Sequence, residues 1–413
     1  MIRPGQAIIL IAIALLVIGV LMVNSASLEA SSASRISLGG ILMGRDAIMA
    51  GAALVAMGVG CLIPVRMLAS TSKLNTAFMV MIILVVLACL LLVHVPGIGR
   101  EINGARRWIQ FGGGIGFQPS EIAKWGVLVV LAWYACAFRK NLGRFFTGFG
   151  PPIVLIGVTC ALIGLEDLGT AVLIFGVSLL MLLAAGARIL HVLALVPLGV
   201  VGIVAAILQS PYRVNRILAY LDPYSDSEGI GYHIIQSMGA IAGGGLAGRG
   251  LGNSIQKFGY LPESTTDFIF AIICEELGLV GACIIILMYI VLLFSGLRII
   301  MNVRNDDVVE DSGSLTDGGH TADSGFLRLL ALGILLMVGC QAFMNIAVVT
   351  GIAPTKGIAL PLLSRGGTGW ILTAFCLGLL ASIDRCSSRA MPSETFRESI
   401  DPDCPMAPMA EPT

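Results

Sequence analysis

The sequence predicts an all-α membrane protein with ten transmembrane helices. Of its 413 residues, 57% are hydrophobic and only 12% are charged, whereas soluble domains are roughly a quarter charged. The apolar residues gather in runs close to the ~20 residues that a helix needs to span a bilayer. These runs lie near residues 6–23, 47–65, 74–94, 121–138, 151–165, 168–186, 190–208, 267–298, 326–350 and 367–384.

The first run follows only Met1 to Gly5, and it is longer than the apolar core of a signal peptide. Because no persuasive A-x-A cleavage site follows it, we interpret it as a retained signal-anchor. A single membrane domain is predicted over 1–384, with a flexible tail over 385–413. The acidic, Gly/Ser-rich loop 299–325 is predicted to be disordered from residue 302.

Charge and cysteine content exclude some classes of function. The net charge is zero, which argues against a surface that attracts nucleic acid as a whole. The 25 lysines and arginines divide almost evenly between the two sides of the predicted bundle, so charge alone gives no orientation. The ten cysteines form no C-x-x-C pair and are predicted to be small packing residues.

Residues 95–120 contain Gly, Asn and Pro at a density that predicts turns rather than a helix. Arg107 and Trp108 lie among them, and their pattern fits either a membrane-surface anchor or a cradle for an anion. Pro119 is placed to begin the next helix. Glu121 and Lys124 follow on one helix face, either as a structural salt bridge or with Lys124 contacting a ligand's phosphate.

Glu166 and Asp167 form a very short connection and are predicted to cap the helix that follows. The connection 209–266 is too long for an idle loop. It starts with Arg213 and Arg216 and has an amphipathic run from Tyr232. Its segment 239–252, GAIAGGGLAGRGLG, matches G-x-G-x-x-G without the strand that a dinucleotide site needs. These glycines serve either close backbone approach or an anion-binding nest.

The stretch 252–281 carries Glu263 and Asp267 at the mouth of an apolar helix. An acid in that place fits a helix N-terminus, and it also fits a functional site, because charge at a membrane boundary needs a partner. Glu275 and Glu276 lie deeper, and the sequence does not identify their partners. The loop 350–369 adds Lys356 and Arg365.

In the ten-helix arrangement the loops 95–120, 209–266 and 350–366 open on one side of the membrane. Cations beside a carboxylate suit a phosphorylated lipid substrate from which a hydroxyl proton is removed. The sequence therefore predicts an enzyme that acts on a lipid-borne pyrophosphate.

Four segments closely resemble the SEDS family (shape, elongation, division and sporulation proteins). They are WIQFGGGIGFQPSEIAK (108–124), LEDLGTA (165–171), the run from Gly231 to Gly281, and NIAVVTGIAPTKGIALPLLSRGGTG (345–369). The match covers nearly the whole membrane region in order. The runs NSIQKFGYLPE and APTKG are more similar to the division members, whereas GYHIIQS is more similar to the elongation members.

The resemblance implies a peptidoglycan glycosyltransferase that polymerises lipid II at the outer face of a bacterial cytoplasmic membrane and releases undecaprenyl pyrophosphate. It implies ten helices with both termini cytoplasmic, a divalent cation (Mg²⁺ or Mn²⁺), a class B penicillin-binding protein as partner, and other division or elongation membrane proteins, with no nucleic acid. Asp267 falls on the family's catalytic acid and is the candidate metal ligand. The candidates for holding substrate are Arg107, Trp108, Ser120, Glu121, Lys124, Arg213, Arg216, Lys257, Glu263, Lys356 and Ser364.

Three residues depart from the family pattern: Thr265 replaces a His, Glu166 a Pro, and Arg365 a Tyr. The first puts a proton-relay role for that His in doubt, and the third adds a cation near the expected phosphate. Two other functions stay open from the sequence: a flippase that moves lipid II between leaflets, and a scaffold that only recruits a transpeptidase.

Overall fold

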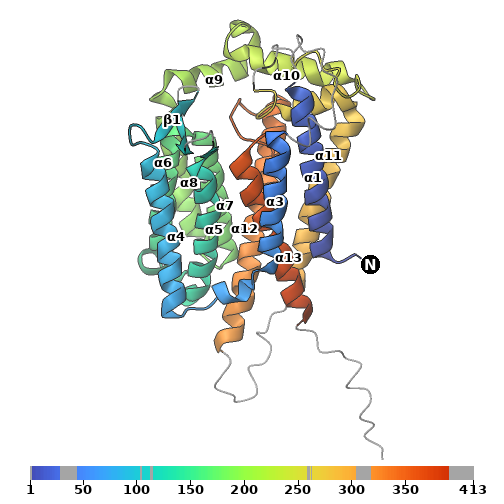
Figure 1. The fold of residues 1–413 in the computed structure, drawn as a ribbon. Coiled ribbons are helices and arrows are strands. Elements are labelled where there is room, and N and C mark those ends of the chain that lie inside the picture. The colour runs from blue at the N-terminus through green and yellow to red at the C-terminus, as the bar shows by residue number, and fades with distance from the viewer. Residues whose placement is uncertain are drawn as a thin grey trace, which may run out of the picture.

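The protein is a bundle of membrane-crossing helices that is covered at one end by a small sheet and two helices lying across it (Figure 1). This computed structural model describes residues 2–27, 44–102, 105–111, 115–257, 261, 263–303 and 318–389. Within these ranges nine helices are long and apolar enough to cross a bilayer, which confirms the predicted all-α membrane fold. They are α1 (Pro4–Ala26), α3 (Arg45–Leu62), α4 (Lys73–Leu92), α5 (Pro119–Ala137), α6 (Gly150–Glu166, preceded by the π-helical turn Phe145–Phe149), α8 (Ile189–Leu208), α11 (Ile269–Asn302), α12 (Gly318–Val349) and α13 (Gly367–Arg389).

A further apolar helix, α7 (Leu168–Ala184), packs inside the bundle with 17 residues. At 1.5 Å per residue it is about 26 Å long, slightly less than the ~30 Å hydrocarbon core. The predicted count of ten therefore depends on α7. Asp167 caps this helix as predicted, because its Oδ1 accepts a hydrogen bond from Thr170 N at 3.1 Å. Glu166 does not cap it: its Oε2 accepts from Arg106 N instead.

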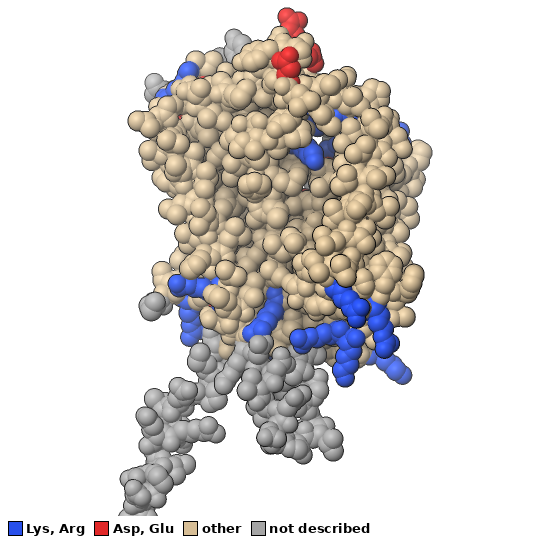
Figure 2. Space-filling view, turned by 180° about the vertical axis from the view of Figure 1, so that it is seen from behind, with Lys and Arg blue, Asp and Glu red and all other residues tan. Residues whose placement is uncertain are grey.

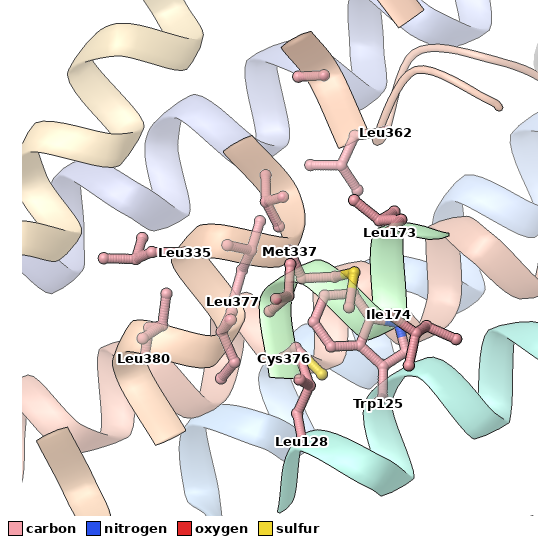
Figure 3. Close-up of a cluster of buried hydrophobic side chains, with 14 of the residues drawn as sticks. Trp125, Leu128, Leu173, Ile174, Leu335, Met337, Leu362, Cys376, Leu377 and Leu380 are labelled. Atoms are coloured by element: carbon pink, nitrogen blue, oxygen red, sulfur yellow. The ribbon is translucent and has the colours of Figure 1, made fainter. Parts of the chain in front are cut away.

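The core lies where α5, α7, α12 and α13 meet. Figure 3 shows Trp125 of α5, Ile174 of α7 and Cys376 of α13 packed together in this region. Helices α5, α12 and α13 bury most of their spanning residues, whereas α8 buries few and lies at the periphery. The described cysteines are free thiols; Cys274 and Cys376 are buried, whereas Cys283 is exposed, and Cys404 lies outside the described ranges.

The segment 95–120 differs from the prediction of turns alone. It forms an antiparallel sheet of three strands, β1 (Gly99–Ile102), β2 (Ala105–Phe111) and β3 (Ile115–Phe117), in the order β1-β2-β3. Arg100 pairs with Trp108, and Ile109 pairs with Phe117. The dipeptide Asn103-Gly104 between apolar and aromatic runs is a strong hairpin signal, and it was not used in the prediction. Both residues lie outside the described ranges.

Two helices of the connection 209–266 cross the same end of the bundle (Figure 1). Pro211 was predicted only to stop the preceding helix, yet it begins the new helix α9 (Pro211–Leu221), where its missing N–H costs nothing. A short 3-10 turn, Pro223–Asp226, leads to α10 (Ile230–Gly244), which confirms the amphipathic run predicted from Tyr232.

The glycine-rich segment after α10 packs against a break in α11. Gly278 has φ of 68° and divides α11 into two helices. A methyl group on Gly244 would overlap the carbonyl of Cys274, and one on Gly248 would overlap that of Glu276. Close backbone approach, the first of the two predicted roles for these glycines, is therefore what the structure contains.

The same segment supplies the hydrogen bonds that the break in α11 leaves open. Leu279 N donates to Gly245 O at 2.9 Å, and Val280 N donates to Leu246 O at 3.3 Å. In return, Arg249 N and Gly250 N donate to the carbonyls of Glu275 and Glu276. Because backbone groups inside a membrane must be paired within the protein, this exchange allows the helix to break there.

The two deep glutamates have the partners that the sequence left unnamed. Glu275 accepts hydrogen bonds from Ser254 Oγ and from the backbone N–H groups of residues 255 and 256. Glu276 accepts from Ser25 Oγ at 2.7 Å and from Lys257 Nζ at 3.3 Å. Both glutamates are buried, so these contacts are what permits their charge at this depth.

Helices continue into the two segments that were predicted to be irregular. The disorder predicted over 302–325 is wrong for its last eight residues, because α12 begins at Gly318, while residues 304–317 lie outside the described ranges. Extending an existing helix avoids the cost of a new nucleus. Likewise α13 continues to Arg389, and Asp384 accepts from Gly5 N at 3.1 Å. The remaining tail, 390–413, lies outside the described ranges.

Candidate active site

Asp267 lies two residues before α11, at the end of the bundle that the sheet and α9 cover. Its backbone is fixed from α12, because Asn345 Nδ2 donates to Asp267 O at 2.8 Å and to Ile358 O at 2.7 Å. Its carboxylate faces Gly357: a methyl group on that glycine would lie 3.0 Å from Asp267 Oδ2. The absence of a side chain at 357 thus leaves space beside the carboxylate.

The surroundings of Asp267 raise its pKa to about 7. Burial is the largest cause, and the negative charges of Glu263 and Asp167 add to it. The positive charges of Arg107 and Arg216 act in the opposite direction. A carboxylate with a pKa near neutral pH can accept a proton during a reaction, as a general base must.

Arg107 reaches the site from β2. Its Nε and Nη2 donate to Glu166 O at 3.0 and 2.6 Å, and its Nη1 lies 3.9 Å from Asp167 Oδ2. The same Nη1 would lie 3.7 Å from a methyl group on Gly357, the glycine that Asp267 also faces. The sheet therefore places a guanidinium and the carboxylate of Asp267 on the same small opening.

The amphipathic helix α9 brings two arginines that do different things. Arg213 donates to the carbonyls of Gly164, Leu165 and Ala206 and so ties α9 to the ends of α6 and α8. Arg216 donates to Thr355 O at 3.3 Å and to the Tyr212 hydroxyl at 2.6 Å. Only Arg216 of the pair contributes to the electrostatics of Asp267.

Lys356 sits beside Gly357 on the loop 350–366 and is half-buried. Burial lowers the pKa of its ammonium group, and the Asp167 carboxylate partly offsets this. Arg107 and Arg216 act on Asp267 and Lys356 acts on the neighbouring Asp167, so three cations from three segments of the chain serve these two acids. This arrangement matches the predicted pairing of a helix-start carboxylate with loop cations.

Glu121 and Lys124 form a buried salt bridge, the first of the two alternatives drawn from the sequence. Lys124 is only 1% exposed, and its Nζ donates to both Glu121 oxygens at 3.0 and 2.8 Å and to Gln341 Oε1 at 2.8 Å. Gln341 in turn donates to Ala359 O at 2.8 Å. The pair therefore supports the loop that carries Lys356, from beneath.

Five other residues were predicted to hold substrate, and the structure places them differently. Ser120 lines a small cavity with Arg107 and Asp167, and Trp108 is half-exposed on β2. Glu263 is exposed, has φ of 53° and accepts from Thr266 Oγ1 at 2.8 Å. The other two are bound elsewhere: Ser364 Oγ accepts from Leu360 N at 2.7 Å, and Lys257 is buried against Glu276.

Asp167 and Asn345 are site residues that the sequence reasoning missed. Asp167 was predicted only as a cap, although its carboxylate interacts electrostatically with Arg107, Lys356 and Asp267. Asn345 is 1% exposed and joins the Asp267 segment to the loop 350–366. Its position inside an apolar helix was the available signal, since a polar residue within the membrane needs a partner.

The three departures from the family pattern also lie around the site. Arg365 N donates to Thr265 O at 2.9 Å, and the Arg365 side chain forms a two-point ion pair with Asp46 at the start of α3, at 2.6 and 3.0 Å. Arg365 is thus engaged with a carboxylate. Glu166 Oε2 accepts from Arg106 N at 2.8 Å and helps to hold the sheet.

A divalent cation at Asp267 is compatible with the oxygen atoms present. Within the described ranges no three His, Cys, Asp or Glu residues cluster as a metal site. However, the buried Asn345 Oδ1 has no hydrogen-bond partner in the described part of the chain. Mg²⁺ commonly uses one or two carboxylates and keeps several waters, so the single carboxylate of Asp267 suits a cation of that kind.

The fold and this site define a polytopic membrane protein. At one end of its helical bundle a buried acid, Asp267, lies near several cations. Residues 6–389 match the family model of the FtsW, RodA and SpoVE proteins, described as "cell cycle protein". The chain belongs to this family, which is the family expected from its motifs.

Individual relatives support the same placement. The chain is 38% identical over 382 residues to a probable peptidoglycan glycosyltransferase FtsW of Geobacter metallireducens, covering 92% of this chain and 94% of that one. It is 37% identical over 385 residues to stage V sporulation protein E of Bacillus subtilis, covering 93% and 98%.

Two solved structures resemble the fold. The first belongs to a study of how a peptidoglycan synthase complex coordinates polymerization and crosslinking; it has a TM-score of 0.62 and 26% identity, and covers 92% of this chain and 97% of that one. The second, the rod shape determining protein RodA of Thermus thermophilus, has a TM-score of 0.55 at 24% identity, covering 93% and 97%.

Proposed function

We propose that the protein is a peptidoglycan glycosyltransferase that polymerises lipid II into glycan strands, in cell division like the FtsW relatives. The observation that carries this proposal is Asp267, a carboxylate with a pKa of about 7 that faces an opening shared with Arg107. A relative named as a peptidoglycan glycosyltransferase matches the chain over 92% of its length.

In the proposed reaction, the Asp267 carboxylate accepts the proton of the acceptor sugar's hydroxyl as that oxygen attacks the donor's anomeric carbon. The bond from this carbon to the pyrophosphate breaks, and undecaprenyl pyrophosphate leaves with its electron pair. Arg107, Arg216 and Lys356 stabilise the charge that develops on the pyrophosphate. The Glu121–Lys124 pair and Asn345 hold the loop and the acid at fixed positions.

The resemblance adds a divalent cation, which we propose binds at the Asp267 carboxylate. It would supply positive charge to the pyrophosphate side of the site. We further propose that the site opens at the outer face of a bacterial cytoplasmic membrane, with both termini cytoplasmic. A class B penicillin-binding protein is the proposed partner, in line with the synthase complex that the fold resembles.

The test is polymerisation of lipid II by the purified protein with its partner, followed by gel analysis of the glycan products with and without Mg²⁺ or Mn²⁺. Asp267→Asn should abolish polymer formation and leave the folded protein intact. Glu228→Gln is the matched control, because Glu228 is an exposed acid of the connection 209–266 and should retain wild-type activity. Full activity of Asp267→Asn would exclude Asp267 as the base, whereas no polymer from the wild-type protein would leave the scaffold role.

A further inference from the structure

The end of the bundle opposite the site carries a group of cations that the proposed reaction does not use. Arg139 and Lys140 follow α5, Arg144 precedes the turn Phe145–Phe149, and Arg188 precedes α8. All four side chains are exposed. Arg188 lies beside the loop 138–144, which carries the other three cations, because a methyl group on Gly143 would lie 3.7 Å from the Nε of Arg188. We call these four residues the basic platform.

The described residues around the basic platform supply no compensating negative charge. The sequence has no Asp or Glu from 122 to 165 or from 168 to 221, and the ion pairs of the described residues include none of the four cations. In Figure 2, Lys and Arg side chains gather at this end, and no described Asp or Glu is visible among them. Within the described part of the chain, these four cations are therefore not used in ion pairs.

The segment 142–149, which carries Arg144, is held in place by the protein core. Leu142 and Phe149 are fully buried, and the Tyr134 hydroxyl donates to Gly148 O at 3.0 Å. The Phe145 and Phe149 rings each lie 5.3 Å from the ring of His191 on α8. Because Arg144 lies between anchored residues, its backbone is held in place before any ligand arrives, and only its exposed side chain has to be ordered on binding.

Large apolar side chains border the basic platform on the surface. Phe146 is 85% exposed, and Ile189 and Leu190 at the start of α8 are more than half exposed. Helix α8 itself buries few of its residues against the bundle. A ligand here meets cations at the headgroup level and an apolar helix face below, which is the pattern of a phospholipid rather than of a free anion.

We propose that the basic platform binds the phosphate of an anionic glycerophospholipid, with its acyl chains against α8. The lipid belongs to the leaflet at this end of the bundle, away from the catalytic site. Each cation near an anionic membrane surface contributes about fivefold to binding, so removing two should weaken binding by about 25-fold.

The test is native mass spectrometry of the purified full-length protein, titrated with phosphatidylglycerol and, in parallel, with phosphatidylcholine of the same chain length. Wild type should bind phosphatidylglycerol preferentially, and Arg144→Gln/Arg188→Gln should lose about 25-fold in affinity. Arg3→Gln/Lys73→Gln removes two exposed cations from the same end and should bind as wild type. Arg144→Lys/Arg188→Lys should restore most of the binding and reports on folding.

Three results would overturn the proposal. Unchanged binding by Arg144→Gln/Arg188→Gln would show that the platform does not hold the lipid. An equal loss in Arg3→Gln/Lys73→Gln would reduce the effect to general surface charge. Equally tight binding of glycerol 3-phosphate, which lacks acyl chains, would mean a site for free anions.

Discussion

At the scale of single residues, the chemistry depends on how Asp267 is kept able to gain and lose a proton near neutral pH. Burial and two neighbouring acids raise its pKa to about 7, and two arginines limit that rise. The place of this acid could be predicted from sequence, because Asp267 stands at the polar start of an apolar helix. Its neighbours Asp167 and Asn345 could not, since they are about 100 and 80 residues away in the chain and meet it only through helix packing.

The pKa of Asp267 predicts a specific pH profile. Because the base must be ionised, polymerisation should rise about tenfold per pH unit below pH 7 and level off above it. Arg216→Gln removes a positive charge that lowers this pKa, so the midpoint should move to higher pH. Initial rates from about pH 5.5 to about 8.5 measure both effects. Arg100→Gln serves as control, because Arg100 is exposed and pairs with Gln110.

The raised pKa of Asp267 makes folding stability fall with increasing pH, whereas the polymerisation rate should rise. Melting curves should therefore be measured together with the rates. The pKa of folded Asp267 lies above its ordinary value of 3.8, and the folded state therefore binds this proton more tightly than the unfolded state. The resulting stabilisation is present below about pH 4 and is lost as the pH rises through about 7. Activity that increases over the range where stability falls cannot come from better folding. A flat rate profile would contradict the role of Asp267 as the base.

At the scale of elements, the broken helix α11 and the glycine segment around it form one unit. Gly245 and Leu246 accept the hydrogen bonds that the break would leave open. The buried pairs of Glu275 and Glu276 fasten the same unit to α1 and to the segment 249–257. The flippase alternative would give these glutamates a role in transport, whereas their hydrogen bonds fix them in a structural network.

The glycine unit predicts a sharp difference between two similar substitutions. Gly248→Ala places a methyl group against the Glu276 carbonyl at a φ of 78°, so the protein should lose most of its folded yield. Gly176→Ala in α7 meets nothing within 4 Å and should be neutral or stabilising by about 0.5–1 kcal/mol. Size-exclusion profiles and melting temperatures in detergent measure both. Equal tolerance of the two substitutions would show that the segment does not depend on close approach.

Elements were predicted from sequence where a repeating pattern identifies them. The apolar runs located the nine long helices well, because composition alone separates them from loops. The small sheet and α9 were not predicted, since their residues are mixed in character and their signals are short. In both cases the local sequence signal is ambiguous. Asn103-Gly104 is compatible with an isolated turn or a hairpin, and Pro211 can end one helix or begin another.

At the scale of the whole molecule, the two ends of the bundle differ in how their cations are used. Near the site, Arg107, Arg213 and Arg365 each contact carbonyls or carboxylates. At the other end the basic platform has no such partners among the described residues. Counting charges treats both groups alike, which explains why the sequence alone gave no orientation. The positive-inside rule likewise counts Lys and Arg in the loops without regard to their partners.

This difference predicts the topology. In a variant without native cysteines, Glu228→Cys should react with a membrane-impermeant maleimide added to intact cells. Lys140→Cys should react only after the cells are opened, because it lies at the opposite end, which we expect to be cytoplasmic. Labelling of both positions from outside, or of Lys140→Cys alone, would reverse the proposed placement of the site.

The break at Gly278 allows the part of α11 next to Asp267 to take a different direction from the membrane-spanning part. A straight helix of 34 residues is about 51 Å long, well beyond the ~30 Å of hydrocarbon. A rigid rod of that length would tilt whenever the bilayer thinned or thickened, and it would carry Asp267 with it. The break near its first third divides α11 into two parts that take different directions, and the glycine segment bonds to both parts at the break. The position of Asp267 therefore depends on the glycine segment as well as on how α11 lies in the membrane.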